Sequence, residues 1–299
     1  MPLCLLLAFA IAHASEPLER KPGQSYYFSF DPYVEYVAGD LPIVLTSPHG
    51  GRLKPDTIRN RTKGVTDMDV NTQELARAVL DALHALSGRH AHLVASHLHR
   101  SKLDPNREIV EAAQGDPMAE RAWREFHDTV RLAIDSAVAR HGFAFLIDLH
   151  GHAHPIPRLE LGYALSTRQL NVPDAEFDRS GVIAVSTLRD LHARRGGSAA
   201  ALLRGPRSLG ALFAARGLRA IPSPAEPQPE GHPYFNGGYI VRRHAAAPDT
   251  PKVDGLQIEC PRAGVRDTAE ARARFANITA EVLAVFLQEN HDFRLDAKK

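Results

Sequence analysis

The sequence has 299 residues, 44% of them hydrophobic and 24% charged, a composition typical of a globular protein with a sizeable core. The 36 Lys and Arg residues nearly balance the 35 Asp and Glu residues, for a net charge of +1. With no long basic run, nothing in the sequence indicates a nucleic-acid partner. The 16 histidines suggest looking for a metal site.

Residues 1–14 are typical of a secretory signal peptide. Residues 3–12 are apolar but too few to cross a bilayer, and Ala12-His13-Ala14 fits the small-x-small cleavage pattern. Because no Lys or Arg precedes the stretch, a buried first helix or a misassigned start codon are the alternatives. We expect residues 15–299 to form a single domain that is periplasmic or secreted and free of the membrane after cleavage, or otherwise cytoplasmic. Cys260 would then be the single cysteine, which excludes an intrachain disulfide.

Strands and helices alternate along the rest of the chain. After an extended lead-in at 15–40, the apolar spacing predicts strands at 42–47, 91–96, 143–149, 237–242 and 255–260. It predicts helices at 69–86, 117–140, 198–216 (interrupted at Gly205-Pro206) and 269–288, and a loop at 223–233. This order predicts an α/β protein, a three-layer sandwich with a mixed, largely parallel sheet.

Potential metal ligands cluster at the expected strand ends, where ligands bind in such sheets. His49 follows the first strand, His150 follows the third, and Glu259 lies near the end of a late strand. Asp67 and Asp69 lie in the loop that opens the helix after His49. Two histidines and one carboxylate, with water in the open position, satisfy a catalytic zinc.

Two of these positions have local support for metal binding. Gly50 and Gly51 after His49 let the backbone approach a ligand closely, although an ordinary turn with an exposed histidine fits as well. Asp148 and His150 are two apart on a strand and share a face, so the carboxylate can orient the imidazole. The alternative there is a solvated histidine cluster, because His152 and His154 follow.

Glu259 is the best candidate for the general base and acid. A carboxylate in an apolar strand is costly unless it has a partner or a function. Its alternative role is a structural ion pair, for example with Arg262.

Two segments are candidates for binding an anion. Arg100 and Arg107 present planar forks that suit carboxylates, and Asp104 and Asn106 could hold them in place. A solvated loop is the competing interpretation. The second segment, 237–243, contains Gly238 and Arg242.

These residues together resemble the N-formylglutamate amidohydrolase family. The matching segments, in order, are Pro48-His-Gly-Gly-Arg52, Thr66-Asp67, Arg100, Asp104-Pro-Asn-Arg107, Asp148-Leu-His150, Asn236-Gly-Gly-Tyr-Ile240 and Leu256-Gln-Ile-Glu259. The resemblance implies a zinc-carboxypeptidase-like fold and one zinc ion per chain, held by His49, Asp67 and His150. It also implies Glu259 and Arg100 as catalytic residues, and a substrate site that includes Asn106, Arg107, Gly238 and Arg242.

The zinc carboxypeptidases of similar fold place a ligand glutamate three residues after the first histidine, where this sequence has Arg52. The carboxylate ligand must therefore come from elsewhere, and Asp67 is preferred to Asp69 because the Thr66-Asp67 pair matches the family pattern.

The activity that the resemblance implies is hydrolysis of a linear amide in a small N-acyl acidic amino acid such as N-formyl-L-glutamate. A zinc carboxypeptidase or peptidoglycan-peptide amidase, acting on a short peptide, is one alternative. A non-catalytic periplasmic metal- or solute-binding protein is another. The oligomeric state and the native metal stay open.

Overall fold

The structure is a computed structural model that describes residues 20–295, so the predicted signal peptide at residues 1–14 lies outside the described residues. The strands are β1 (Ser25–Tyr26), β2 (Val34–Val37), β3 (Ile43–Ser47), β4 (His92–Ser96), β5 (Ala144–His152), β6 (Leu159–Gly162), β7 (Ala220–Ile221) and β8 (Val253–Pro261). The helices are α1 (Thr72–Ser87), α2 (Ile109–Ala113), α3 (Pro117–His141), α4 (Thr167–Leu170), α5 (Asp174–Ser180), η1 (Val182–Val185), α6 (Arg189–Arg195), α7 (Ala199–Arg204), α8 (Leu209–Ala214), α9 (Tyr239–His244), η2 (Arg262–Arg266) and α10 (Ala269–His291).

The strands within residues 20–295 form one mixed sheet in the order β1-β2-β4-β3-β5-β8-β6-β7. The four central strands, β4, β3, β5 and β8, run parallel to one another, whereas β2 and β6 pair antiparallel with β4 and β8. The carboxyl ends of the four central strands therefore lie at one edge of the sheet. Residues from four separate segments of the chain meet at this edge.

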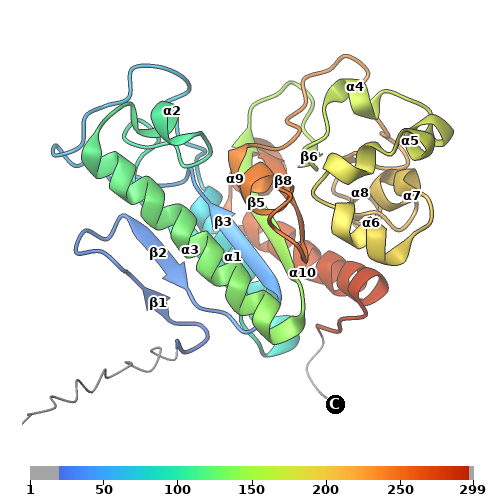
Figure 1. Ribbon diagram of the computed structural model, residues 1–299, viewed down its shortest axis with the longest axis horizontal. Helices are drawn as coiled ribbons and strands as arrows, with labels where there is room; N and C mark the ends of the chain where they lie inside the picture. Colours follow the sequence, from blue (N-terminus) through green and yellow to red (C-terminus); the bar gives the residue numbers. More distant parts are fainter. Residues whose placement is uncertain (1–19, 296–299) are drawn as a thin grey trace, which may run out of the picture.

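Helices cover both faces of the sheet. Because side chains alternate along a strand, Phe145, Ile147 and Leu149 of β5 join the hydrophobic cluster with α1 and α10, and Ala144 and Leu146 join the cluster with α3 and α9. Figure 1 shows α3 in front of the sheet and α10 behind it. The predicted α/β class and three-layer architecture are confirmed.

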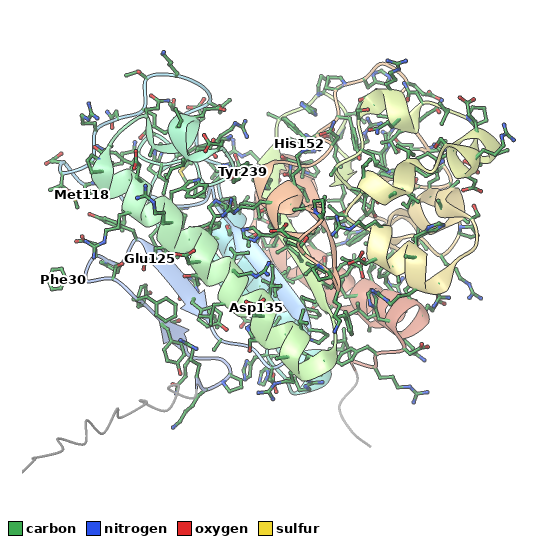
Figure 2. All side chains as sticks on the ribbon, in the orientation of Figure 1. Phe30, Met118, Glu125, Asp135, His152 and Tyr239 are labelled. Atoms are coloured by element: carbon green, nitrogen blue, oxygen red, sulfur yellow. The ribbon has the colours of Figure 1, made fainter. Side chains whose placement is uncertain are left out.

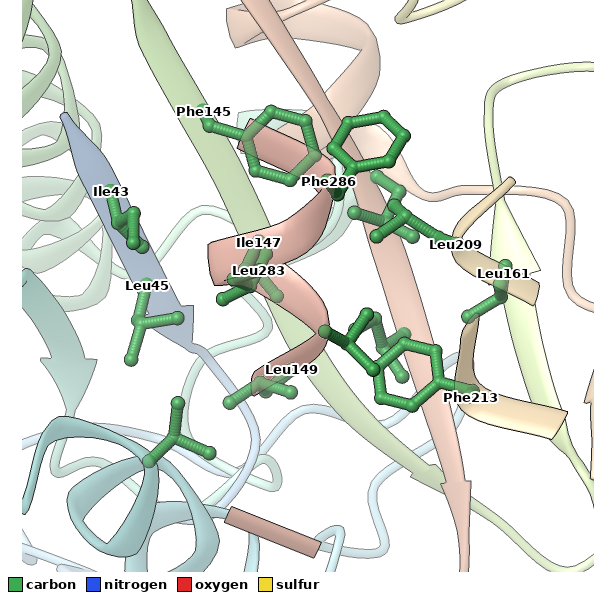
Figure 3. Close-up of a cluster of buried hydrophobic side chains, with 14 of the residues drawn as sticks. Ile43, Leu45, Phe145, Ile147, Leu149, Leu161, Leu209, Phe213, Leu283 and Phe286 are labelled. Atoms are coloured by element: carbon green, nitrogen blue, oxygen red, sulfur yellow. The ribbon is translucent and has the colours of Figure 1, made fainter. Parts of the chain in front are cut away.

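The larger core lies between the sheet and α10. Figure 3 shows Phe145 of β5 and Phe286 of α10 with their rings side by side, and their centroids are 5.6 Å apart. Burying an aliphatic or aromatic side chain of this size contributes roughly 1.5–3 kcal/mol relative to exposure. This packing fixes β5, the strand that carries His150, from the face opposite to the histidine.

The long helix α3 has clear end signals in the sequence. The Asp116 side chain accepts hydrogen bonds from the backbone N–H groups of Met118 and Ala119, and Pro117 begins the helix. Gly142 ends it in the left-handed conformation, at a φ of 80°. The helix predicted at 117–140 is confirmed to within a residue.

Other predicted elements lie close to their observed bounds. The expected strands at 42–47, 91–96, 143–149 and 255–260 are β3, β4, β5 and β8, and the closing helix is α10. The interruption at Gly205 separates α7 from α8, within a group of short helices that lies beside β6 in Figure 1. No helix within residues 20–295 is long and apolar enough to cross a membrane.

The prediction of a strand at 237–242 is wrong, because Tyr239–His244 is the helix α9. The Tyr-Ile-Val run has high strand propensity, but a short segment takes its structure from packing. Ile240, Val241 and His244 are buried, a spacing that gives a helix one inward face.

Candidate metal centre and active site

Pairing between β5 and β8 brings four polar side chains together at the carboxyl edge of the sheet. Asp148 is opposite Gln257 and His150 is opposite Glu259, so all four point to the face covered by α3 and α9. Figure 2 labels His152, at the end of β5, and Tyr239, at the start of α9, near this edge. These four residues are therefore held by paired strands, which position side chains more rigidly than loops do.

Three buried side chains from separate segments converge here: His49, Asp69 and His150. The two Nδ1 atoms of His49 and His150 are 3.0 Å apart, and each lies 3.3 Å from Oδ2 of Asp69. Ligands placed tetrahedrally ~2.0–2.1 Å from zinc lie roughly 3.3–3.4 Å from one another. The three atoms thus have nearly the spacing that a tetrahedral zinc requires.

The opposite nitrogen of each ring is held by a carboxylate. Nε2 of His49 is 2.6 Å from Oδ1 of Asp104, and Nε2 of His150 is 2.8 Å from Oδ2 of Asp148. Thr46 donates a hydrogen bond of 2.6 Å to the other oxygen of Asp148. An ionised carboxylate only accepts hydrogen bonds, so each Nε2 carries a hydrogen, and the lone pair of the neutral form of each ring is at Nδ1.

With both rings neutral, two lone pairs and a carboxylate oxygen would face one another in a buried site, an arrangement that is repulsive unless a proton or a metal cation lies between them. Charge supports this conclusion. Burial alone would lower the pKa of His150, but Asp148 and Asp69 outweigh burial and hold that pKa well above its usual range. Burial likewise opposes ionisation of Asp69, and the two histidines outweigh it and lower its pKa. The residues present fit a divalent metal ion with nitrogen and oxygen ligands.

The carboxylate in this group is Asp69 rather than Asp67. Asp69 is fixed locally, since its backbone N–H donates to the His49 carbonyl and its own carbonyl accepts from the Thr72 hydroxyl at the start of α1. Asp67 lines the same cavity but is exposed and lies outside the group of three. The Thr66-Asp67 pattern pointed to the neighbouring carboxylate, and only the fold distinguishes the two.

Glu259 lies beside this group with one oxygen engaged and one free. Oε1 accepts a hydrogen bond of 2.8 Å from Gln257, whereas Oε2 is buried without a hydrogen-bond partner among the described residues. Burial raises the pKa of Glu259 to about 8, Asp69 adds to the rise, and His150 opposes it. Glu259 thus has an unengaged oxygen and a shifted proton affinity, as a proton-transfer group requires.

Arg100 links two of the carboxylates around His49, Asp69 and His150. Its Nε donates to Asp104 at 2.9 Å, and one Nη lies 3.4 Å from Asp69. The arginine lines the cavity, so the guanidinium both contacts the Asp69 carboxylate and borders the open space. Asp104, expected only to hold an arginine, also fixes His49.

Asn106 and Gly238 form one structural unit at the cavity wall. Asn106 Oδ1 accepts from the N–H of Ile240, and the N–H of Gly238 donates to Gln257 at 2.6 Å. A Cβ atom on Gly238 would lie 2.1 Å from the Asn106 amide nitrogen, so only glycine permits this approach. Both residues line the cavity, as does Arg107.

Arg242 does not lie in the cavity lining. Its guanidinium donates to the carbonyls of Gly237 and Ala164 and to the Asn236 side chain. The structure therefore gives Arg242 the task of holding the turn before α9, in place of the substrate contact that the sequence suggested.

A second group of possible ligands, His152, His154 and Glu160, lies at the same edge. Both ring nitrogens of His152 are occupied by backbone, at the Arg158 carbonyl (2.8 Å) and the His154 N–H (3.1 Å). His154 Nδ1 is 2.9 Å from Oε1 of Glu160. These contacts engage both ring nitrogens of His152 and Nδ1 of His154, so the group binds the cavity wall together.

The cavity above His49, Asp69 and His150 has a volume of about 600 Å³, within the range of pockets for small organic molecules. Its lining includes the three grouped residues, Glu259 and Arg100. Glu259 and the three grouped residues therefore border the same space.

Neither the protein-family models nor the curated proteins give a match to this sequence. Among solved structures, the fold is similar to N-formylglutamate amidohydrolase from Ralstonia eutropha JMP134, with a TM-score of 0.52 and 16% identity over 87% of this chain and 98% of that chain. It is also similar to the gene product Atu2144 from Agrobacterium tumefaciens, with a TM-score of 0.51 and 14% identity over 86% of this chain and 95% of that chain. The shared fold agrees with the architecture that the sequence resemblance implies.

Proposed function

We propose that this protein is a zinc-dependent amidohydrolase that cleaves the linear amide of a small N-acyl amino acid. The observation that carries the proposal is the convergence of His49 Nδ1, His150 Nδ1 and Asp69 Oδ2 beside the free oxygen of Glu259. N-formyl-L-glutamate, which the sequence resemblance names, is the reference substrate and would yield formate and glutamate.

His49, Asp69 and His150 would hold one zinc ion, with Asp69 in place of the Asp67 that the sequence pattern favoured. When bound there, zinc supplies Lewis-acid chemistry, polarising the amide carbonyl and lowering the pKa of water. Asp104 and Asp148 keep both rings in the tautomer that presents Nδ1.

Glu259 moves the proton. A zinc ion held beside it would favour the ionised carboxylate of Glu259, whose Oε2 would then take a proton from the attacking water and deliver it to the leaving nitrogen, which makes the amine a neutral leaving group. Gln257 holds Oε1 at 2.8 Å and so aims Oε2. Arg100 borders the cavity and favours the negative charge that develops on the carbonyl oxygen.

A purely solute-binding protein has no need for a buried carboxylate with an unengaged oxygen, because such a group costs stability. A peptidase or peptide amidase uses the same residues, so substrate tests must separate it from the N-acyl amino acid hydrolase.

The first experiment measures zinc by elemental analysis in the wild type, Asp69→Asn and the matched control Asp67→Asn. We expect near one zinc per chain in the wild type and control, and a loss in Asp69→Asn, with circular dichroism to establish that each variant is folded. Equal zinc in both variants would refute the ligand assignment.

The second experiment follows formate release from N-formyl-L-glutamate by zinc-loaded wild type and Glu259→Gln. We expect a rate about 10²–10⁴-fold lower in the variant, at unchanged zinc content. Hydrolysis of cell-wall peptides alone would support the peptidase alternative, and zinc binding without any hydrolysis would support a binding protein.

A further inference from the structure

The cavity at the candidate metal centre is lined by three large apolar side chains that stay partly exposed. They are Val65, Val70 and Phe235, which are 50%, 40% and 44% exposed. They belong to the loop before α1 and the loop before α9. Large apolar side chains that stay exposed beside a polar centre mark a place where a ligand supplies the missing apolar contact.

Phe235 is held in place by a buried carboxylate. Its backbone N–H donates to Oε2 of Glu160 at 2.8 Å, and its ring stacks on His154 at 4.5 Å between centroids with an interplanar angle of 16°. Glu160 is fully buried, and its other oxygen is 2.9 Å from Nδ1 of His154. One carboxylate therefore positions both rings, which gives the cavity a rigid aromatic surface.

The charges in the cavity wall fit a substrate with a single carboxylate. Four arginines line it, and three are engaged: Arg100 with the carboxylates beside the metal group, Arg107 with Glu111 at 3.1 Å, and Arg266 with backbone carbonyls. Arg262 forms no salt bridge or side-chain hydrogen bond within residues 20–295. N-formyl-L-glutamate carries two carboxylates, and the wall offers one unengaged cation among the described residues.

We propose that the preferred substrate is an N-acyl derivative of an aromatic or bulky apolar amino acid, whose side chain packs on Phe235 and whose carboxylate pairs with Arg262. This inference rests on the proposed amide hydrolysis and specifies its substrate class. The volume of about 600 Å³ leaves room for such a side chain. Phe235 and Arg262 are then specificity-determining residues, separate from the groups that carry the chemistry.

The test compares kcat/KM for N-formyl-L-phenylalanine and N-formyl-L-glutamate in the zinc-loaded wild type, Phe235→Ala, Arg262→Gln and the control Val110→Ala. Val110 is exposed and does not line the cavity. We expect the wild type to prefer the phenylalanine substrate by about tenfold or more, as burial of an aromatic side chain allows. Phe235→Ala should remove most of that preference, and Val110→Ala should keep it.

Arg262→Gln should raise the KM for N-formyl-L-phenylalanine about tenfold or more. The KM for the carboxamide of this substrate should not change, because the carboxamide has no charge to pair with Arg262. A wild-type preference for N-formyl-L-glutamate, or an unchanged ratio in Phe235→Ala, would overturn the inference.

A separate readout distinguishes this inference from the proposed function. Glu259→Gln is expected to turn over substrate about 10²–10⁴-fold more slowly than the wild type, so the heat released on mixing it with substrate reports binding. Preferential binding of N-formyl-L-phenylalanine without hydrolysis by the wild type would uphold the substrate class and refute the hydrolase. Hydrolysis of N-formyl-L-glutamate with no preferential binding of the phenylalanine derivative would uphold the hydrolase and refute the proposed substrate class.

Discussion

Asp148→Asn tests the idea that a carboxylate behind His150 sets up the metal site. Asp148 is fully buried between the Thr46 hydroxyl at 2.6 Å and Nε2 of His150 at 2.8 Å. Asparagine keeps the shape and can still accept from His150 while its NH₂ group faces the hydroxyl oxygen of Thr46. The substitution therefore removes mainly charge, which makes Nδ1 of His150 a weaker ligand.

The expected loss of zinc affinity is about 10–100-fold, the usual effect of removing such a partner. That range corresponds to roughly 1.4–2.8 kcal/mol. Because zinc stabilises the folded state by mass action, the stabilisation at saturating zinc should fall by the same amount. At about 2 °C per kcal/mol for a chain of this size, the zinc-induced rise in Tm should shrink by about 3–6 °C.

Thermal unfolding with and without zinc, combined with a competition titration against a chelator, measures both quantities. Asp254→Asn is the matched control, because Asp254 is also a fully buried carboxylate but pairs with Arg194 at 2.9 Å, away from the cavity lining. It should lower stability equally with and without zinc. A folded Asp148→Asn protein with wild-type zinc affinity would refute the assignment of Asp148 as the partner that activates His150.

Three further predictions concern proton binding, packing and close approach. In the metal-free protein the pKa of Glu259 is raised from 4.5 to about 8, so the folded state keeps a proton that the unfolded chain loses. The wild type should therefore lose stability relative to Glu259→Gln as pH rises from about 4.5 to 8 in urea titrations, and parallel curves would contradict the shift. Phe286→Ala leaves a cavity against Phe145 and should cost about 3–5 kcal/mol by urea unfolding with zinc content unchanged, whereas a cost under about 1 kcal/mol would disprove tight packing. Gly238→Ala places a Cβ where the Asn106 side chain lies and should cost about 1–3 kcal/mol at unchanged zinc content, and wild-type stability would disprove the close approach.

Much of the architecture could be predicted because the spacing of apolar residues along a segment indicates which of its faces are buried. The apolar run at 143–149 is β5, covered on both faces, and the periodic spacing at 117–140 is α3 with its capping residues. Prediction failed where segments are short. The Tyr-Ile-Val run of α9 has strand propensity, but packing against β5 and β8 makes it helical.

The chemistry of the candidate site was also partly readable from the residues. His49, His150 and Glu259 could be placed at strand ends, and the two-residue spacing of Asp148 and His150 predicted their contact. Asp69 and Asp104, which complete the arrangement around the two histidines, have no comparable local pattern in the sequence.

The layers, the central parallel strands and the edge at which the polar residues gather could all be read from the residues, because hydrophobic periodicity and the order of the elements indicate which faces are buried. The folded structure was needed to show that Asp69 rather than Asp67 meets the two histidines, that Asp104 holds His49, and that Arg242 turns away from the cavity. These outcomes depend on distances of about an ångström between segments far apart in the chain. No local pattern encodes such distances, and the packing of β3, β5 and β8 with their loops sets them.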